Sequence, residues 1–407
     1  MAARAAIDVP GTYVFDAEQS RRGYHLNKLL LSLRAAGNRA AFRRDEAGYC
    51  DAYGLSAAQK DALLARDWVR MLDLSGNIFC VFKLALVDHR SMQFLGGVFS
   101  GMTEEQFSAM MAAGGRTGAP DLWQGSMAEV IWGLATSHVP SIGAAMDRGQ
   151  TQDPYWKPLF DGYQPARDWM ARHVPDVALI IYNDHANAFG VDMVPTFAIG
   201  TADAYKVADE GFGPRPVPDV TGAPELAQHL VTRLIDDGFD LTVCQNFDVD
   251  HGLTVPLSVF CPDPGDAWPC AVVPLLVNVI QYPQPTAARC YALGQAIKRA
   301  VDSFPRDLKI AVFGTGGMSH QLAGARAGYI NTSFDQVFLD AIESDPLLLA
   351  GMTREQYIRE AGSEGIELIM WLIMRGAMNP SVRRVHRTYH VPASNTAVGL
   401  ALFDNRA

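Results

Sequence analysis

The chain has 407 residues, of which 49% are apolar and 19% charged, and its formal net charge at pH 7 is −10. This composition can bury a large core, which excludes an intrinsically disordered protein, and the length predicts either two domains or one large and one small domain. No basic surplus exists to neutralise phosphates, which argues against nucleic acid and anionic membranes as partners, whereas a small anionic substrate needs only a local positive centre.

The cysteines and the apolar runs indicate the compartment in which the chain works. Its six cysteines form no CxxC pair, which favours reduced thiols and argues against structural zinc. Residues 1–11 lack the apolar stretch of a signal peptide, and the longest apolar runs, at 271–280 and 366–374, are too short to span a bilayer. We therefore expect a soluble, cytoplasmic protein.

The first part of the chain, residues 1–115, is predicted to be a small all-α domain. Leucines recur at helical spacing between residues 26 and 33, and capping boxes are predicted at 56–59 and 103–106. No segment here shows the period-two alternation of a half-buried strand.

A change in composition follows this helical part. Residues 116–127 are rich in glycine and are predicted to form a linker. Over residues 128–407, apolar strands alternate with helical segments such as 223–237 and 287–304. This alternation predicts an α/β domain, with a mostly parallel sheet flanked by helices.

Four predicted strands in this second part are each followed by a histidine. Because functional groups gather at the carboxyl ends of strands in open α/β sheets, we expect the four histidines to meet at one edge of the sheet. In chain order, the strand at 131–137 leads to His138, 177–182 to His185, 240–244 to His251, and 308–313 to His320. The last histidine follows the glycine-rich turn 314–317.

These residue types suit a non-haem Fe(II) centre. Such a site uses two neutral imidazoles and one carboxylate and leaves three positions open. His138 and His185 supply the imidazoles, and a buried helix predicted at 363–371 supplies either Glu364 or Glu367. A carboxylate among apolar side chains is costly to bury unless a cation or hydrogen bonds offset the cost. The remaining His251 and His320 would then be free for acid–base chemistry near neutral pH.

Each of these features also has a simpler interpretation. A histidine at a strand end is often a hydrogen-bonded turn residue, although four of them with a buried acid favour a functional site. The glycine-rich turn fits neither the dinucleotide-binding nor the P-loop frame, so we expect no phosphate site. His390 stays open as a residue at the rim, and the other histidines are interpreted as structural, namely His25, His89, His173, His229 and His386.

The motifs around these residues resemble a known family, the type II extradiol dioxygenases, which include protocatechuate 4,5-dioxygenase and gallate dioxygenases. The resemblance to the catalytic β subunit runs from about residue 127 to 403, and the helical part is similar to the small α subunit. The motifs that carry it are Thr136-Ser137-His138-Val139-Pro140, Tyr182-Asn183-Asp184-His185, Asp248-Val249-Asp250-His251-Gly252, Gly314-Thr315-Gly316-Gly317-Met318-Ser319-His320-Gln321, Gly362-Ser363-Glu364-Gly365-Ile366-Glu367 and Pro392-Ala393-Ser394-Asn395-Thr396.

The resemblance assigns roles to individual residues. It implies Fe(II) held by His138, His185 and Glu367, with His320 as the catalytic acid–base and His251 beside the substrate. Ser394 and Asn395 would bind the carboxylate of the aromatic ring.

The resemblance also implies a substrate and a partner. The expected reaction is the opening of a catechol carboxylate, protocatechuate, by O₂ at the 4,5 bond, giving 4-carboxy-2-hydroxymuconate semialdehyde. Gallate-cleaving relatives resemble this chain with the two parts in reverse order, which favours protocatechuate, and the fused chain is expected to form a homodimer. Ring opening of gallate or an aminophenol, or a non-catalytic protein that binds a metal or a partner, are the alternatives.

Overall fold

The computed structural model of the chain describes residues 13–113 and 127–406. The chain divides into two compact units, Met1–Gln124 and Gly125–Ala407, which we call the helical unit and the α/β unit. The linker predicted at 116–127 lies outside the described residues except for Met127. Within the described ranges, no helix is long and apolar enough to cross a membrane.

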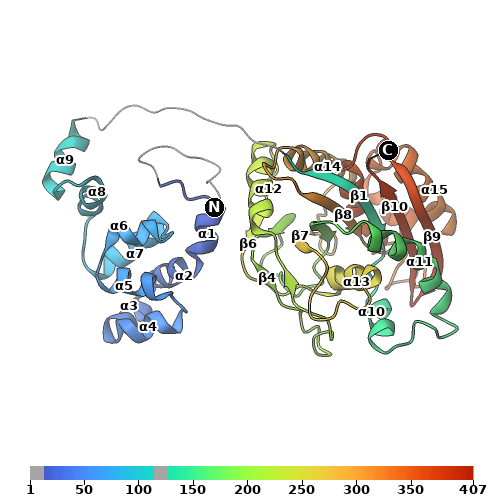
Figure 1. Cartoon of the computed structure of the whole chain (residues 1–407), viewed down its shortest axis with the longest axis horizontal. Coiled ribbons are helices and arrows are strands. Elements are labelled where there is room, and N and C mark those ends of the chain that lie inside the picture. The colour runs from blue at the N-terminus through green and yellow to red at the C-terminus, as the bar shows by residue number, and fades with distance from the viewer. Residues whose placement is uncertain (1–12, 114–126, 407) are drawn as a thin grey trace. The chain divides into compact units, whose positions relative to one another are not determined.

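The helical unit contains helices and no strand within residues 13–113, which confirms the all-α prediction (Figure 1). The predicted leucine stripe of Leu26, Leu29, Leu30 and Leu33 is fully buried in its core. Both predicted capping boxes are present, at the starts of α5 and α9. The helices are α1 (Ala17–Arg22), α2 (Tyr24–Ser32), α3 (Ala36–Arg44), α4 (Glu46–Ala52), α5 (Ala57–Leu64), α6 (Trp68–Asp73), α7 (Ile78–Val87), α8 (Met92–Ser100) and α9 (Glu104–Ala112).

The α/β unit is built on one eight-stranded mixed sheet with the order β6-β3-β7-β2-β8-β1-β10-β9. Strands β7, β2, β8 and β1 run parallel to one another, while β10 is antiparallel to β1 and β9 is antiparallel to β10. The strands are β1 (Glu129–Thr136), β2 (Val177–Tyr182), β3 (Phe197–Gly200), β6 (Thr242–Cys244), β7 (Ala271–Val277), β8 (Lys309–Thr315), β9 (Arg383–Ala393) and β10 (Thr396–Asp404), and a separate two-stranded sheet pairs β4 (Ala204–Tyr205) with β5 (Val220–Thr221).

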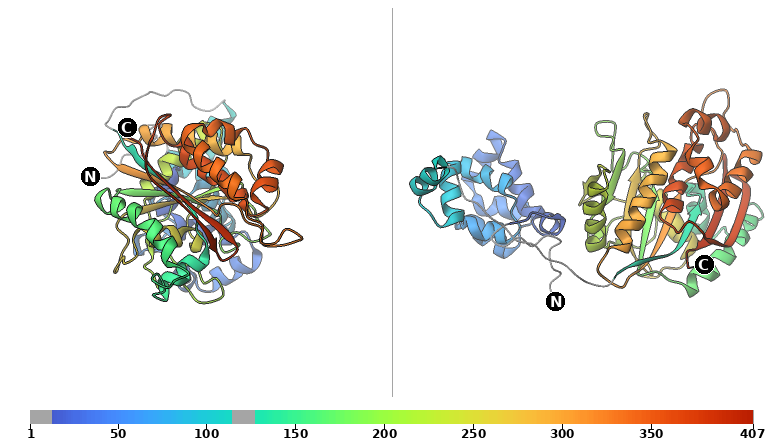
Figure 2. Two further views of the ribbon diagram at one scale, coloured as in Figure 1. Left: turned by 90° about the vertical axis from the view of Figure 1, so that its right-hand side faces the viewer. Right: turned by 90° about the horizontal axis from the view of Figure 1, so that it is seen from above.

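Both faces of the sheet are buried, as expected for parallel strands covered by helices. Along β2, Val177, Leu179 and Ile181 enter one core, whereas Ala178, Ile180 and Tyr182 enter the other. One face carries α10 (Pro140–Asp147), α11 (Lys157–Arg172) and α13 (His251–Phe260) (Figure 2). The other face carries α12 (Pro224–Asp236), α14 (Ala287–Asp302), α15 (Thr332–Ser344), α16 (Pro346–Ala350), α17 (Arg354–Ala361), the 3₁₀ helix η1 (Gly365–Leu368) and α18 (Ile369–Gly376).

The expectation that all four histidine-bearing strands point the same way is wrong for β6. Strand β3 pairs antiparallel with β7, and β6 pairs parallel with β3, so β6 runs against β1, β2 and β8. The carboxyl end of β6 therefore lies at the opposite edge of the sheet. His251 reaches the other histidines because the segment 245–250 leads away from β6 to the start of α13. The reason for the error is that side-chain alternation is the same for either strand direction.

Candidate metal centre and active site

His138 follows the end of β1 and is 3% exposed. The hydroxyl of Thr315, at the end of β8, donates to the Ile181 carbonyl at 3.0 Å, so its oxygen accepts the Nδ1 hydrogen of His138 at 2.8 Å. This bond leaves a lone pair on Nε2, a buried nitrogen that has no hydrogen-bond partner among the described residues. Burial lowers the pKa of His138, which keeps the ring neutral and able to bind a metal.

Glu367 is the carboxylate that approaches this nitrogen. Its Oε2 lies 3.6 Å from His138 Nε2 and accepts a 2.6 Å hydrogen bond from the Gly317 amide. Burial alone would raise the pKa of Glu367, but the imidazoles of His138, His320 and His185 lower it to about 2. The Glu367 carboxylate is therefore ionised, which is the protonation state that a metal ion requires of it.

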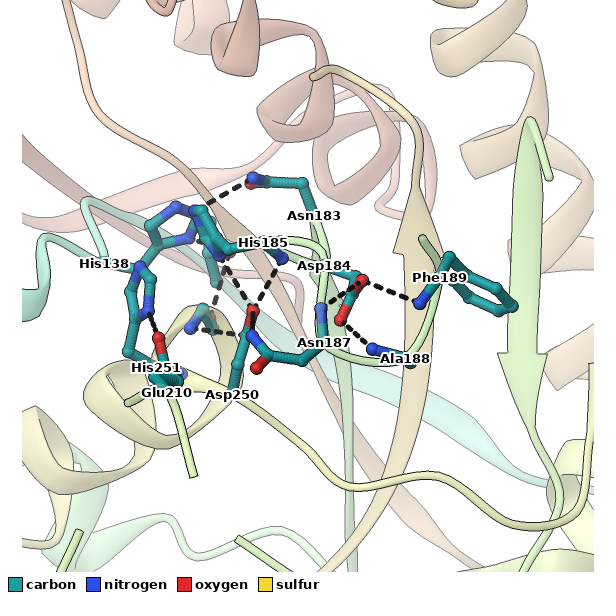
Figure 3. Close-up of polar contacts among 12 residues, drawn as sticks. His138, Asn183, Asp184, His185, Asn187, Ala188, Phe189, Glu210, Asp250 and His251 are labelled. Carbon is teal, nitrogen blue, oxygen red and sulfur yellow. Dashed lines mark hydrogen bonds and ion pairs between the residues drawn. The ribbon is translucent and has the colours of Figure 1, made fainter. Parts of the chain in front are cut away.

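His185 follows β2 and is oriented by Asp250. The Asp250 carboxylate accepts both the His185 amide at 2.7 Å and the His185 Nδ1 hydrogen at 2.9 Å (Figure 3). Although burial disfavours the charged ring, Asp250 raises the pKa of His185 overall. The bond at Nδ1 leaves Nε2 as the possible metal donor, and Asn183 Nδ2 contacts that atom at 3.0 Å. A metal ion bound at His185 Nε2 would displace the Asn183 amide from that atom, and it would compete with a proton for the same lone pair.

His251, the first residue of α13, lies against His185. Their ring centroids are 3.9 Å apart, and the centroid of His138 is 5.8 Å from that of His251. One ligand nitrogen from each of His138, His185 and His251 lies within 4.8 Å of the other two, so this trio can also hold a metal ion. Glu367 is not in that trio. Among the described residues, His251 therefore completes the closer donor set with His138 and His185, whereas Glu367 adjoins that set through its 3.6 Å approach to His138.

His320 is held in one tautomer by its own backbone. Its Nδ1 donates to the Met318 carbonyl at 2.7 Å, which leaves Nε2 to accept or return a proton. His320 is 6% exposed, and its ring lies against Gly317, the residue whose amide donates to Glu367. This position suits an acid–base residue beside the candidate metal donors.

The loop that carries His320 is fixed by the fully buried carboxylate of Asp335. Asp335 accepts from the Ser319 amide at 2.9 Å, from the Ser319 hydroxyl at 2.6 Å and from the Tyr389 hydroxyl at 2.8 Å. Burial raises the pKa of Asp335. Its hydrogen bonds tie α15 and β9 to the residue next to His320.

Ser394 and Asn395 lie in the turn between β9 and β10. The Ser394 hydroxyl donates to Ser141 Oγ at 2.9 Å, and its amide donates to the Tyr155 hydroxyl at 3.1 Å. Since Ser141 lies in α10, three residues after His138, these contacts bring Ser394 near the start of that helix. Asn395 is exposed. His390 lies on β9 and is partly buried.

The helix predicted at 363–371 differs in the structure, and its two acids diverge. The chain forms η1 over Gly365–Leu368 before α18 begins at Ile369. Glu364 precedes η1, and its carboxylate accepts from the Leu322 amide at 2.8 Å and from the Ser363 hydroxyl at 2.7 Å. The two acids diverge because Glu364 lies before η1, whereas Glu367 lies within it. Glu367 faces His138, whereas Glu364 binds a neighbouring loop.

Three supporting residues were given no role from the sequence: Thr315 and Asp250, which lie within the quoted motifs, and Glu210, which lies outside them. Asp250 is the N-cap of α13, where its carboxylate accepts from the Gly252 amide at 2.9 Å. An aspartate directly before an apolar helix is a recognisable N-cap signal and could have drawn attention to it. Glu210 binds His251 from a loop 41 residues earlier in the chain, and no local pattern marks it.

The chain is similar to known ring-opening dioxygenases. Residues 26–112 match the family described as "Aromatic-ring-opening dioxygenase LigAB, LigA subunit". A gallate dioxygenase from Pseudomonas putida is 44% identical over 200 residues, which is 49% of this chain and 58% of that protein. A 2,3-dihydroxyphenylpropionate/2,3-dihydroxicinnamic acid 1,2-dioxygenase from Photorhabdus laumondii is 31% identical over 188 residues, covering 46% of this chain and 55% of the relative.

Each of these alignments therefore spans little more than half of the relative. An uncharacterized protein from Escherichia coli K12 has a solved structure with a TM-score of 0.43 and 14% identity, covering 67% of this chain and 99% of its own. The strongest evidence of kinship is the match over residues 133–399, which include the histidines and Glu367 described above. On this match, the chain belongs to the family described as the catalytic LigB subunit of aromatic ring-opening dioxygenase.

Proposed function

We propose that this chain is a non-haem Fe(II)-dependent extradiol dioxygenase that opens protocatechuate at the 4,5 bond. The observation that carries the proposal is the buried Nε2 of His138, which has no hydrogen-bond partner among the described residues. An oxygen of the ionised Glu367 lies 3.6 Å from this nitrogen, and the ring of His185 lies beside that of His138. A buried polar atom without a partner is costly, and a shared cation would offset that cost. The donor set of two imidazoles and one carboxylate suits Fe(II).

In this proposal His138, His185 and Glu367 hold the iron. When bound, Fe(II) would supply a Lewis acid for the two adjacent ring oxygens and electron density for O₂. The protein side chains supply the remaining chemistry. Nε2 of His320 takes a proton from a ring hydroxyl and later returns it, because Nδ1 is engaged by the Met318 carbonyl. His251 lies beside the substrate.

The carboxylate of the substrate is proposed to bind at the turn between β9 and β10. Asn395 would donate a hydrogen bond to it, and so would Ser394 once its hydroxyl turns from Ser141 Oγ to the carboxylate. Both oxygen atoms of O₂ enter the product, and the cleaved bond lies beside the two hydroxyls rather than between them. The family resemblance further supports a homodimer of the fused chain, which sedimentation would test.

Gallate is the second candidate substrate, because the gallate dioxygenase from Pseudomonas putida is 44% identical over its matched region. The test is oxygen uptake by the anaerobically iron-loaded chain with protocatechuate, gallate and an aminophenol in parallel. The proposal expects fastest uptake with protocatechuate and a yellow product. Faster uptake with gallate or the aminophenol would reassign the substrate. No uptake with any of them, by a chain that retains iron, would contradict ring opening and favour a non-catalytic role.

A further inference from the structure

Glu210, in a loop outside the sheet, makes two hydrogen bonds to His251. Its Oε1 accepts the His251 backbone amide at 2.8 Å, and its Oε2 accepts the Nδ1 hydrogen of the same residue at 2.5 Å (Figure 3). The Glu210 side chain is 27% exposed and that of His251 is 9% exposed. Both oxygens of the Glu210 carboxylate thus accept hydrogen bonds from the same histidine.

Backbone and side-chain hydrogen bonds hold the loop of Glu210 in place beside His251. Ala208 donates to the Val249 carbonyl at 2.9 Å, and the Val249 amide donates to the Lys206 carbonyl at 2.8 Å, which ties the segment before Glu210 to the residues just before His251. On the other side, Asp209 Oδ1 accepts the amides of Gly211 and Gly213, both at 2.9 Å. Both glycines have positive φ, at 93° and 82°, a conformation that favours glycine.

The arrangement determines which nitrogen of His251 faces the histidine cluster. A neutral imidazole has one donor nitrogen and one acceptor nitrogen, and the hydrogen bond at one sets the role of the other. Since Nδ1 donates to Glu210, Nε2 carries the lone pair. The trio of ligand nitrogens from His138, His185 and His251 shows that this ring borders the candidate centre.

We propose that Glu210 is a positioning residue for the reaction, which fixes His251 so that Nε2 accepts a hydrogen bond from a ring hydroxyl of the substrate. This inference rests on the proposed function. His251 and His320 then present the same nitrogen to the substrate by different means, because His320 is fixed by a backbone carbonyl and His251 by a carboxylate from another loop.

The test compares Glu210→Gln with Glu343→Gln in the full chain. Glu343 is a matched control because its side chain is 28% exposed and pairs with Arg384 at 2.9 Å, in contact with none of the histidines of the cluster. The His251 ring nitrogens are read by long-range ¹H–¹⁵N NMR in the chain loaded with Zn²⁺, a diamagnetic substitute, with His251→Gln to assign the signals. Turnover, KM and metal content are measured on the iron-loaded forms.

We expect a protonated Nδ1 and an unprotonated Nε2 on His251 in the parent chain and in Glu343→Gln, and a mixture of tautomers in Glu210→Gln. We also expect kcat to fall roughly 10- to 100-fold in Glu210→Gln, by analogy with the loss of carboxylate partners of metal-bound histidines, with metal content and KM near those of the control. Glu210→Asp retains the charge and should recover part of kcat.

Each contrary result has a distinct meaning. An unchanged tautomer or unchanged kcat in Glu210→Gln overturns the positioning role. Loss of metal from Glu210→Gln overturns it too, because His251 would then be a metal ligand rather than a substrate contact. If the parent chain opens no aromatic ring, the proposed function fails and the catalytic role of Glu210 with it, while the NMR signals still report whether Glu210 sets the tautomer.

Discussion

Gly316 directly follows β8, and Glu367 packs against it. Replacing Gly316 with alanine tests how closely the backbone at this position fixes the place of the Glu367 carboxylate. A Cβ at this position would be 2.7 Å from the Glu367 Cβ, and 3.2 Å from both the Glu367 carbonyl oxygen and the Met370 Cε. Carbon atoms in ordinary contact are about 3.5–4.0 Å apart. Glu367 must therefore move by roughly 1 Å, or β8 must move away from η1.

Two costs add in Gly316→Ala. The φ of Gly316 is +132°, a region that L-residues rarely adopt, at a cost of about 1–3 kcal/mol. Overpacking against Glu367 and Met370 adds about 1–3 kcal/mol. We expect a loss of about 2–6 kcal/mol in the free energy of unfolding of the α/β unit and roughly 10- to 100-fold weaker metal binding, since the displaced residue is a proposed ligand.

The matched control is Gly238→Ala. Gly238 has a φ of +83° and would place a Cβ with nothing within 4 Å, so it carries the conformational cost without a clash. Urea unfolding of the metal-free chains gives the stabilities, and Zn²⁺ titration gives the affinities. If Gly316→Ala costs no more than Gly238→Ala and binds Zn²⁺ equally well, Gly316 does not set the position of Glu367.

Three further substitutions probe the surroundings of the site. His320→Phe should leave iron content near normal while turnover falls by roughly 10²- to 10⁴-fold, the usual contribution of general acid–base catalysis; unchanged turnover would remove its assigned role. Asp250→Asn should weaken Zn²⁺ binding roughly 10- to 100-fold by releasing His185, and unaltered affinity would show that another group orients that ring. Asp335→Asn replaces an acceptor oxygen with a donor group opposite Ser319, so we expect a loss of about 2–3 kcal/mol in urea unfolding, and a loss below about 1 kcal/mol would contradict the hydrogen bonds assigned to it.

Local sequence patterns anticipated the parts of the fold that depend on local chemistry. The capping boxes at the starts of α5 and α9 are satisfied by a side chain three residues away, so their chemistry is complete within one turn of helix. Apolar runs bounded by polar residues located β1, β2 and β8, because buried parallel strands need apolar side chains on both faces. The histidines after these strands followed from the same reasoning.

Features that depend on long-range pairing were not accessible in this way. The direction of β6 is set by its pairing with β3 and by the antiparallel pairing of β3 with β7, and alternation of side chains carries no trace of either. Glu367 was distinguished from Glu364 only through family resemblance, because the contacts that separate the two carboxylates come from distant loops: Glu364 accepts from the Leu322 amide and Glu367 from the Gly317 amide. Glu210 comes from a loop whose partner lies 41 residues away.

The choice between Glu367 and His251 as the third metal ligand is the point on which the proposed centre depends. Iron bound per chain after anaerobic reconstitution should be measured for the parent chain, His138→Ala, Glu367→Gln and His251→Gln. The proposed centre predicts that the parent and His251→Gln retain iron, while His138→Ala and Glu367→Gln lose it. Retention of iron by Glu367→Gln together with its loss from His251→Gln would contradict the centre and replace it with the three-histidine set.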